Sequence, residues 1–245
     1  MISSKYITFA RLRFYIGNVY RFVSGVKYQK RININQACTI FGSSFCDNGW
    51  HHIRETLKEY DGNPSIDYRD TTMYHFMKYF CPKSICDLSN NKKKCNLSLF
   101  EYPWGKIYTT KSKDPLISRF CGPSSDEFIQ DQYNRTINLY NELKKTSYKP
   151  WKFGNQFIEG MLLINRFGEK RFVVLQGNHR MAIFSHLGMK TINIRLSKLY
   201  RSPIKESDVL SWVNVKRGLI SVESAKNIFN LFFKENGFHI KAFKI

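Results

Sequence analysis

Val174–Ala182, with the sequence VLQGNHRMA, joins two different hydrophobic patterns. Its first residues continue the run Arg171–Leu175, whose β-branched and aromatic side chains favour a strand, whereas His179–Leu187 has the apolar spacing of a helix. Gly177 at the junction lets the backbone approach a ligand closely. A helix that begins directly after a turn offers N–H groups that have no partner within the helix. We therefore predict a strand, a tight turn and a helix whose N-terminus can bind a phosphate group.

The turn also contains two side chains that suit an anion. The guanidinium group of Arg180 matches the geometry of a phosphate, and His179 could donate a hydrogen bond or a positive charge to it. An alternative interpretation makes Gly177 a tight-turn residue and leaves His179 and Arg180 capping the helix or solvated. The residue chemistry alone favours neither interpretation.

Further elements are predicted on both sides of the turn. Phe157–Ile164 has a strand pattern and is joined to Arg171–Leu175 by the turn Asn165–Gly168, which predicts a hairpin. Gly188 should end the helix, and Thr191–Leu196 resumes as a strand. The predicted order is therefore a strand, a turn at Gly177, a helix and a second strand.

A long helix is predicted over Asp126–Lys145. Ser124 and Ser125 supply hydroxyl caps, and acidic residues follow in the first turn. Apolar residues recur on one face, namely Ile129, Tyr133, Ile137, Tyr140 and Leu143. The remaining predicted segments are a basic amphipathic helix over 7–23, two helices within 47–80, a polar exposed loop over 82–96, a short strand over 106–110, and helices near 205–215 and over 221–235.

The composition indicates an ordered globular protein. The chain has 245 residues, of which 42% are apolar and 16% aromatic, enough for one sizeable core and a smaller satellite domain. Its longest apolar runs fall far short of the roughly 20 residues that span a bilayer, and its N-terminus lacks the pattern of a secretory signal peptide. We therefore expect a cytoplasmic protein without a transmembrane helix.

The six cysteines favour reduced thiols over a disulfide framework, because they are sparse in a chain of this length. Cys81, Cys86 and Cys95 are spaced more widely than zinc ligands usually are. His51 and His52 are adjacent, and adjacent residues of a helix point to different faces. We assign no metal to either group.

The formal charge of +20 predicts attraction to polyanions such as nucleic acid, an anionic membrane or phosphorylated small molecules. Residues 1–46 contain seven Lys or Arg residues, and the first acidic residue is Asp47. The basic segment 1–31 could lie against the inner face of an anionic membrane, or it could pack on the domain with its arginines solvated. Abundant lysine is also expected of an AT-rich genome, which weakens a purely functional explanation of the charge.

The block Phe172–Ala182, followed by Leu187–Ile194, resembles the ParB/sulfiredoxin superfamily. The match is to the turn Gly-x-[His/Arg]-Arg, the alanine after it, the Leu-Gly helix end and the closing strand, and it covers roughly residues 105–196. The resemblance implies an α+β (α/β) fold, in which a small mixed sheet is flanked by helices. It divides the chain into a mainly helical basic N-terminal region (1–100), a nucleotide-binding domain (101–200) and a C-terminal helical cap (201–245).

Members of this superfamily use the turn to bind nucleotide phosphates. The resemblance therefore implies that phosphate is contacted by Gly177, Asn178, His179 and Arg180. A second phosphate-contacting segment of the family maps to Arg119, Gly122, Ser124 and Ser125. The two serines would in any case cap the following helix.

Departures from the family pattern argue against two of the activities found in the superfamily. Asn178 stands where sulfiredoxins have their nucleophilic cysteine, which argues against sulfinic acid reduction. ParB partition proteins usually have a glutamate and a second arginine where Asn178 and His179 stand, followed by a helix-turn-helix domain, and no recognition helix is evident after Leu196. The turn is most similar to that of small-molecule kinases in the superfamily. A weaker similarity, in the segments 50–52, 79–82 and 103–104, is to ParB-like proteins of bacterial surface-polysaccharide biosynthesis.

The resemblance thus predicts a phosphotransferase that uses ATP or ADP, with Mg²⁺, and acts on a sugar or another hydroxyl compound. His179 and Glu159 are the candidate catalytic residues, because phosphoryl transfer needs a group that orients or deprotonates the acceptor. Glu159 could equally face solvent. The sequence contains neither a Walker-type phosphate loop nor the signatures of protein kinases. The alternatives are a ParB-like nucleic-acid-binding protein or nuclease, and a non-catalytic membrane-associated scaffold.

Overall fold

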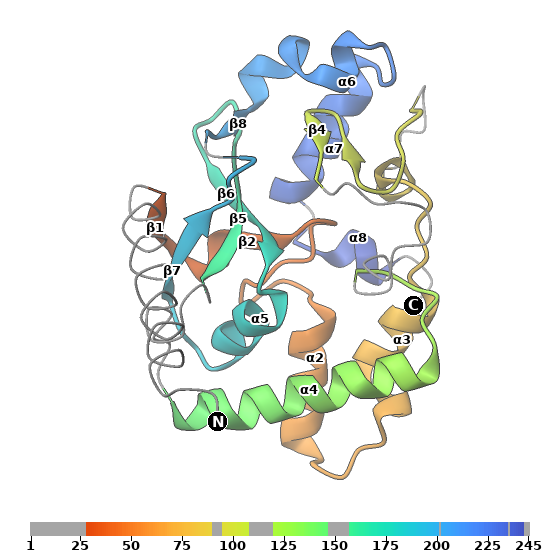
Figure 1. Cartoon of the computed structure of the whole chain (residues 1–245), viewed down its shortest axis with the longest axis vertical. Helices are drawn as coiled ribbons and strands as arrows, with labels where there is room; N and C mark the ends of the chain where they lie inside the picture. Colours follow the sequence, from red (N-terminus) through yellow and green to blue (C-terminus); the bar gives the residue numbers. More distant parts are fainter. Residues whose placement is uncertain are drawn as a thin grey trace, which may run out of the picture.

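A computed structural model describes residues 28–89, 95–107, 120–146, 157–200, 202–234 and 236–242. These residues form a mixed α+β structure, in which a six-stranded mixed sheet is flanked by helices (Figure 1). The predicted helix over 7–23 and the predicted site residue Arg119 lie outside the described residues. None of the helices in the described ranges is long and apolar enough to cross a membrane.

The predicted hairpin forms the centre of the sheet. Its strands, β5 (Ile158–Ile164) and β6 (Lys170–Gln176), are antiparallel, with Leu162 opposite Phe172. Strong burial of both strands explains their nearly continuous apolar sequence. The strand order is β1 (Gln29–Asn33), β7 (Thr191–Leu196), β5 (Ile158–Ile164), β6 (Lys170–Gln176) and β2 (Ala37–Thr39), and β8 (Ile204–Lys205) also pairs with β5. The pairs β5–β7 and β2–β6 are parallel, so the sheet is mixed.

Two strands of this sheet come from the region that was expected to be mainly helical. β1 pairs with β7, and β2 pairs with β6. Neither strand has the alternation that identifies a strand in a sequence: all three residues of β2 are buried, and β1 is a largely polar strand at the sheet edge. The N-terminal part of the chain therefore contributes to the same core as the second half.

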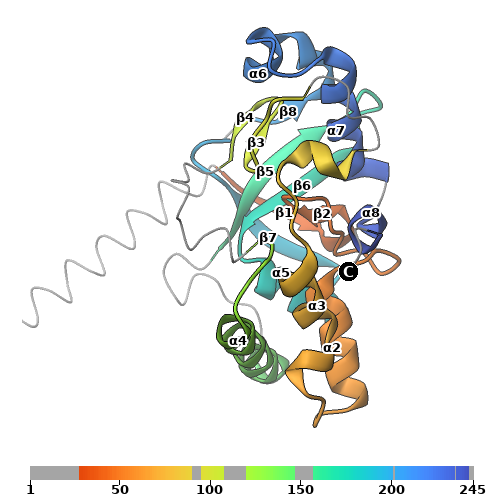
Figure 2. The ribbon, with the colours of Figure 1, turned by 90° about the vertical axis from the view of Figure 1, so that its right-hand side faces the viewer.

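Helices cover one end of the sheet. The predicted long helix is α4 (Asp126–Lys145), whose N-terminus is capped by Ser125, and the helix after the glycine turn is α5 (Asn178–His186). The two helices predicted within 47–80 are α2 (His52–Gly62) and α3 (Thr72–Tyr79). Figure 1 shows α4 below α5 and crossing in front of α2 and α3, and Figure 2 shows α4 beside these two helices.

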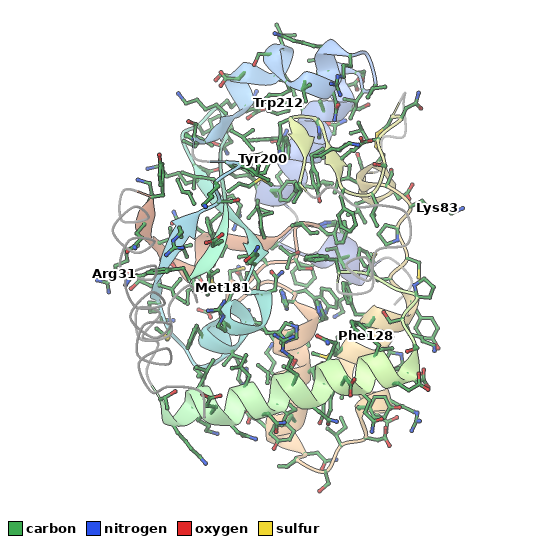
Figure 3. All side chains as sticks on the ribbon, viewed as in Figure 1. Arg31, Lys83, Phe128, Met181, Tyr200 and Trp212 are labelled. Atoms are coloured by element: carbon green, nitrogen blue, oxygen red, sulfur yellow. A yellow bond between two sulfur atoms is a disulfide. The ribbon has the colours of Figure 1, made fainter. Side chains whose placement is uncertain are left out.

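Two of the C-terminal helices lie toward the opposite end of the molecule (Figure 1). The predicted helix over 221–235 is α7 (Val222–Lys234), whereas the segment near 205–215 is divided into a 3-10 helix, Glu206–Ser211, and the short α6, Val213–Lys216. Trp212 between them is buried against Phe229, with ring centroids 5.4 Å apart. Figure 3 shows Trp212 far from Phe128 on α4. A last short helix is α8 (Phe238–Lys241).

The predicted exposed loop over 82–96 is partly buried. Ser84 caps a 3-10 helix, Ile85–Leu88, and this turn directs apolar side chains into the core. Cys86 is paired with Cys95 in a disulfide, which corrects the expectation that all the cysteines are reduced. Of the strand predicted over 106–110, only residues 106 and 107 are described, and Lys106 belongs to β4 (Gly105–Lys106), which pairs with β3 (Glu101–Tyr102).

Candidate functional site

A cavity of about 490 Å³ lies at the N-terminus of α5. Its walls come from α2, α3, α4, α5, the end of β6 and the segment that follows β2. The described residues that line it are Thr39, Ile40, Phe41, Ser43, His52, Ile53, Phe76, Phe120, Gln132, Arg135, Leu139, Leu175, Gln176, Gly177, Asn178, His179 and Arg180. The structure thus brings the four residues predicted from the turn into one cavity.

Gly177 connects β6 to α5 in a conformation that other residues rarely adopt. Its φ angle is +95°, in the left-handed region. A Cβ atom at this position would lie 3.0 Å from Cγ1 of Ile158 and 3.3 Å from Nη2 of Arg180. The residues that follow this bend, Asn178, His179 and Arg180, line the cavity, and the first N–H groups of a helix have no acceptor within it.

Two arginines from different helices line the cavity. Arg135 comes from α4, and Arg180 comes from the first turn of α5. None of the described lining residues is an aspartate or glutamate. Positive charge from the side chains adds to that of the helix N-terminus, so the cavity favours an anion.

The imidazole of His179 is held in one tautomer by a hydrogen bond. Its Nδ1 lies 2.9 Å from Oγ1 of Thr136, and that hydroxyl donates its only hydrogen to the backbone oxygen of Gln132 at 2.7 Å. The hydroxyl oxygen can therefore only accept from His179, which places the hydrogen on Nδ1 and leaves Nε2 as an acceptor. Burial, and next the charge of Arg135, lower the pKa of His179 to about 4. At neutral pH this ring is an uncharged proton acceptor, not a cation.

A second neutral histidine lines the same cavity. Burial, and next the proximity of His179, lower the pKa of His52 to about 3. Its ring stacks on Phe76 with centroids 3.8 Å apart, and on His51 at 4.7 Å. The adjacent histidines thus stack instead of pointing to different faces. The reason is that His51 is the extended N-cap residue of α2, so helical spacing does not apply to the pair.

The described residues of the second predicted phosphate-contacting segment, Gly122, Ser124 and Ser125, are not among the described lining of this cavity. The backbone N–H groups of Gly122 and Ser124 donate to the oxygens of Phe80 and Met77, at 2.7 and 3.1 Å. Ser125 accepts a hydrogen bond from the N–H of Phe128, as expected for a helix cap. These residues therefore attach the start of α4 to the end of α3.

Glu159 is also outside the described lining of the cavity. It lies on β5 and forms an ion pair with Arg195 of β7, with Oε1 3.3 Å from Nη1. Both side chains are largely buried, with 24% and 12% of their surfaces exposed. The guanidinium group of Arg195 also lies over the ring of Phe157 at 4.4 Å. Glu159 therefore pairs with a cation of the neighbouring strand and does not face the cavity as described.

Several residues of the site were not predicted from the sequence. Gln132 and Arg135 line the cavity from α4, and His52 lines it from α2, while Thr136 of α4 holds His179. A helical projection of α4 places Gln132 and Thr136 on one face, because they are four residues apart. Only the packing of α4 against α5 shows that this face meets His179. Among the described residues, no group of three or more His, Cys, Asp or Glu side chains is arranged to hold a metal ion.

Comparison of the chain with protein-family models, with curated proteins and with solved structures found no match. The chemistry of the cavity is therefore derived from its own residues.

Proposed function

We propose that this cavity binds the phosphate groups of a nucleotide, ATP or ADP, and that the protein transfers a phosphoryl group to a hydroxyl compound. One observation carries the proposal. The N-terminus of α5, Arg135 and Arg180 converge on a cavity of about 490 Å³ whose described lining contains no carboxylate. This volume is within the range of roughly 300–1,000 Å³ that is usual for small-molecule sites.

The phosphate contacts follow from the donors present. The first N–H groups of α5 can donate to one phosphate oxygen, while the guanidinium groups of Arg135 and Arg180 can each donate a pair of hydrogen bonds. Charge-assisted bonds of this kind are stronger than neutral ones. A phosphate at this position would neutralise the positive field of the cavity.

The rest of the cavity suits a planar, partly apolar group such as a nucleobase. Phe41, Phe76 and Leu139 provide apolar surface. The Oδ1 atom of Asn178 is buried and has no hydrogen-bond partner among the described residues. Since a buried acceptor without a partner is costly, a donor on a bound ligand would stabilise it.

His179 is the group proposed to accept the proton in the transfer. The acceptor oxygen forms a bond to the terminal phosphorus of ATP, while the bond from that phosphorus to the bridging oxygen breaks. ADP leaves with the electron pair, and the proton of the acceptor hydroxyl passes to Nε2 of His179. This assignment replaces Glu159 as the proposed base, because Glu159 is paired with Arg195.

Mg²⁺ was also expected with the nucleotide, but the described lining of the cavity fits it poorly. Protein sites for Mg²⁺ usually provide one or two carboxylates beside the phosphates, and this lining provides none. We therefore assign charge stabilisation to the two arginines and derive no step through a metal ion.

Calorimetric titration with ATP and ADP tests the proposal. The variants Arg180→Ala and Arg135→Ala should each weaken binding by about 10- to 100-fold, as expected for the loss of charge-assisted hydrogen bonds of roughly 1.5–3 kcal/mol. Arg166→Ala is a matched control, because Arg166 is exposed and lines a different pocket. Absence of binding to the unmodified protein, or equal binding by Arg180→Ala, would overturn the proposal.

Nucleic-acid binding is the second candidate, and the formal charge of +20 is the observation that favours it. A protein that neutralises several DNA phosphates loses affinity steeply as salt increases. A gel-shift titration between low and physiological salt separates the candidates. Salt-sensitive DNA binding without nucleotide binding would favour this alternative.

A further inference from the structure

A second depression lies beside the cavity, along the exposed side of α4. Its volume is about 660 Å³, and its described lining residues are Arg135, Asn138, Leu139, Glu142 and Arg180. Four of them are spaced at i, i+3, i+4 and i+7 on α4, so they form one continuous strip along the helix. We refer to this depression as the α4 groove.

The α4 groove and the cavity share three lining residues. These are Arg135, Leu139 and Arg180. The two arginines that are proposed to hold phosphate therefore stand at the junction between the cavity and the groove. One molecule could extend across this junction into both spaces, or two molecules could occupy one space each and meet at the arginines.

The two spaces differ in chemistry. The described lining of the cavity combines apolar side chains with the amides Gln132, Gln176 and Asn178 and has no carboxylate, whereas the groove adds the amide Asn138 and the carboxylate Glu142. Both of these side chains are exposed. An amide donates and accepts hydrogen bonds, and an ionised carboxylate accepts them from hydroxyl groups. This pair of groups suits a ligand that carries several hydroxyls.

We propose that the α4 groove binds a polyhydroxylated group, such as a sugar, beside the phosphates held by Arg135 and Arg180. This inference rests on the proposed function, and it names the class of the hydroxyl compound and the residues that recognise it. Asn138 and Glu142 are positioning residues that hold the hydroxyls. Glu142 is then the carboxylate on the acceptor side, a role for which Glu159 is poorly placed.

A probe that links both spaces tests the inference. ADP-glucose carries a nucleotide, a diphosphate and a sugar, and it is compared with ADP by calorimetric titration of the full chain. We expect ADP-glucose to bind about 5- to 10-fold more tightly than ADP, as one or two net hydrogen bonds would give. Asn138→Ala and Glu142→Ala should remove this gain without weakening the binding of ADP.

Asn134→Ala and Asn141→Ala are matched controls, because both residues are exposed on α4 and neither lines the groove. Each control should keep the preference for ADP-glucose. If ADP binds but ADP-glucose binds no more tightly, or if Asn138→Ala and Glu142→Ala keep the full gain, the groove assignment is wrong and the proposed function stands. If neither compound binds, both proposals are wrong.

Discussion

At the scale of single residues, the cavity depends on side chains and backbone angles that are each determined by local packing. Gly177 adopts a φ angle of +95° between β6 and α5, and it contacts Ile158 so closely that a methyl group would have little space. The hydrogen bond from His179 to Thr136 determines that Nε2 is the ring nitrogen left as a proton acceptor. The sequence predicted the first of these features from the glycine, but the second requires the partner on α4.

Gly177→Ala should destabilise the protein by two effects. A left-handed φ angle costs an L-residue about 1–2 kcal/mol, and the new Cβ would lie 3.0 Å from Cγ1 of Ile158. Gly168→Ala is the control, because Gly168 has a φ angle of +81° but nothing within 4 Å of its Cβ position. Thermal unfolding should show a larger loss for Gly177→Ala, and equal losses would show that the contact with Ile158 has no effect.

His52 should make the protein sensitive to acid. Its pKa is 6.5 when unperturbed and about 3 in the folded protein, where burial and then His179 disfavour the charged ring. Between these values the unfolded chain binds more protons, so the free energy of unfolding falls as the pH decreases from 6.5 toward 3. Above pH 6.5 His52 contributes no pH dependence.

His52→Phe tests this assignment, since phenylalanine can keep the stack on Phe76 but does not titrate. Urea unfolding at several pH values should show a smaller loss of stability on acidification than in the unmodified protein. The exposed His75 provides the control variant His75→Phe, for which the loss should be unchanged. An unchanged acid loss in His52→Phe would contradict the account.

At the scale of elements, three helices are joined by one polar cluster beyond the cavity. Asp61 at the end of α2 accepts hydrogen bonds from Tyr140 of α4 at 2.9 Å and interacts with Nε2 of His186, the last residue of α5, at 2.7 Å. Lys144 lies 5.3 Å from the centre of the Tyr140 ring. The cluster fixes α4 relative to α5, and that packing brings Arg135 beside Arg180.

Tyr140→Phe should therefore loosen this packing. Loss of the hydroxyl leaves Asp61 with fewer partners and should cost about 1 kcal/mol of unfolding free energy, the usual size for a hydrogen bond. Tyr79→Phe is the control, because Tyr79 is 53% exposed. Denaturant unfolding measures both variants, and an equal stability of Tyr140→Phe and the unmodified protein would show that the cluster does not hold the helices.

The sequence predicted the elements that have a clear period or a clear stop. The bounds of α4 agree with the prediction because its caps and apolar stripe are local features, and the hairpin β5–β6 follows from its turn. β1 and β2 were missed because strand pairing between residues far apart leaves little local signal in short strands. The contribution of Arg135 and His52 to the cavity was missed for the same reason, since it depends on how α2, α4 and α5 pack.

At the scale of the whole molecule, the cavity proposed to bind a nucleotide and the basic N-terminal segment proposed to attract a membrane lie in different parts of the chain. The cavity lies at the end of the sheet that α4 covers, while α6 and α7 lie toward the other end (Figure 1). Residues 1–27 of the basic segment 1–31 are outside the described residues, so the attraction of this segment to an anionic membrane stays a prediction. The structure places Gln29–Asn33 in the sheet, so a test of the segment should leave β1 intact.

Deletion of residues 1–27 distinguishes the two interpretations of this segment. If it binds lipid, the full chain should float with vesicles that contain phosphatidylserine but not with neutral phosphatidylcholine vesicles, and the deletion should abolish flotation. Flotation that survives the deletion would assign any lipid binding to the folded part. Nucleotide binding should be unaffected, because the described lining of the cavity begins at Thr39.

A crystal structure of the protein soaked with ADP tests the central claim most directly. The account predicts a phosphate group within hydrogen-bond distance, about 3 Å, of the N–H groups at the start of α5 and of the guanidinium groups of Arg135 and Arg180. The nucleobase should lie against the apolar walls of the cavity. An ADP molecule bound elsewhere, or a cavity that stays empty at saturating ADP, would contradict the account.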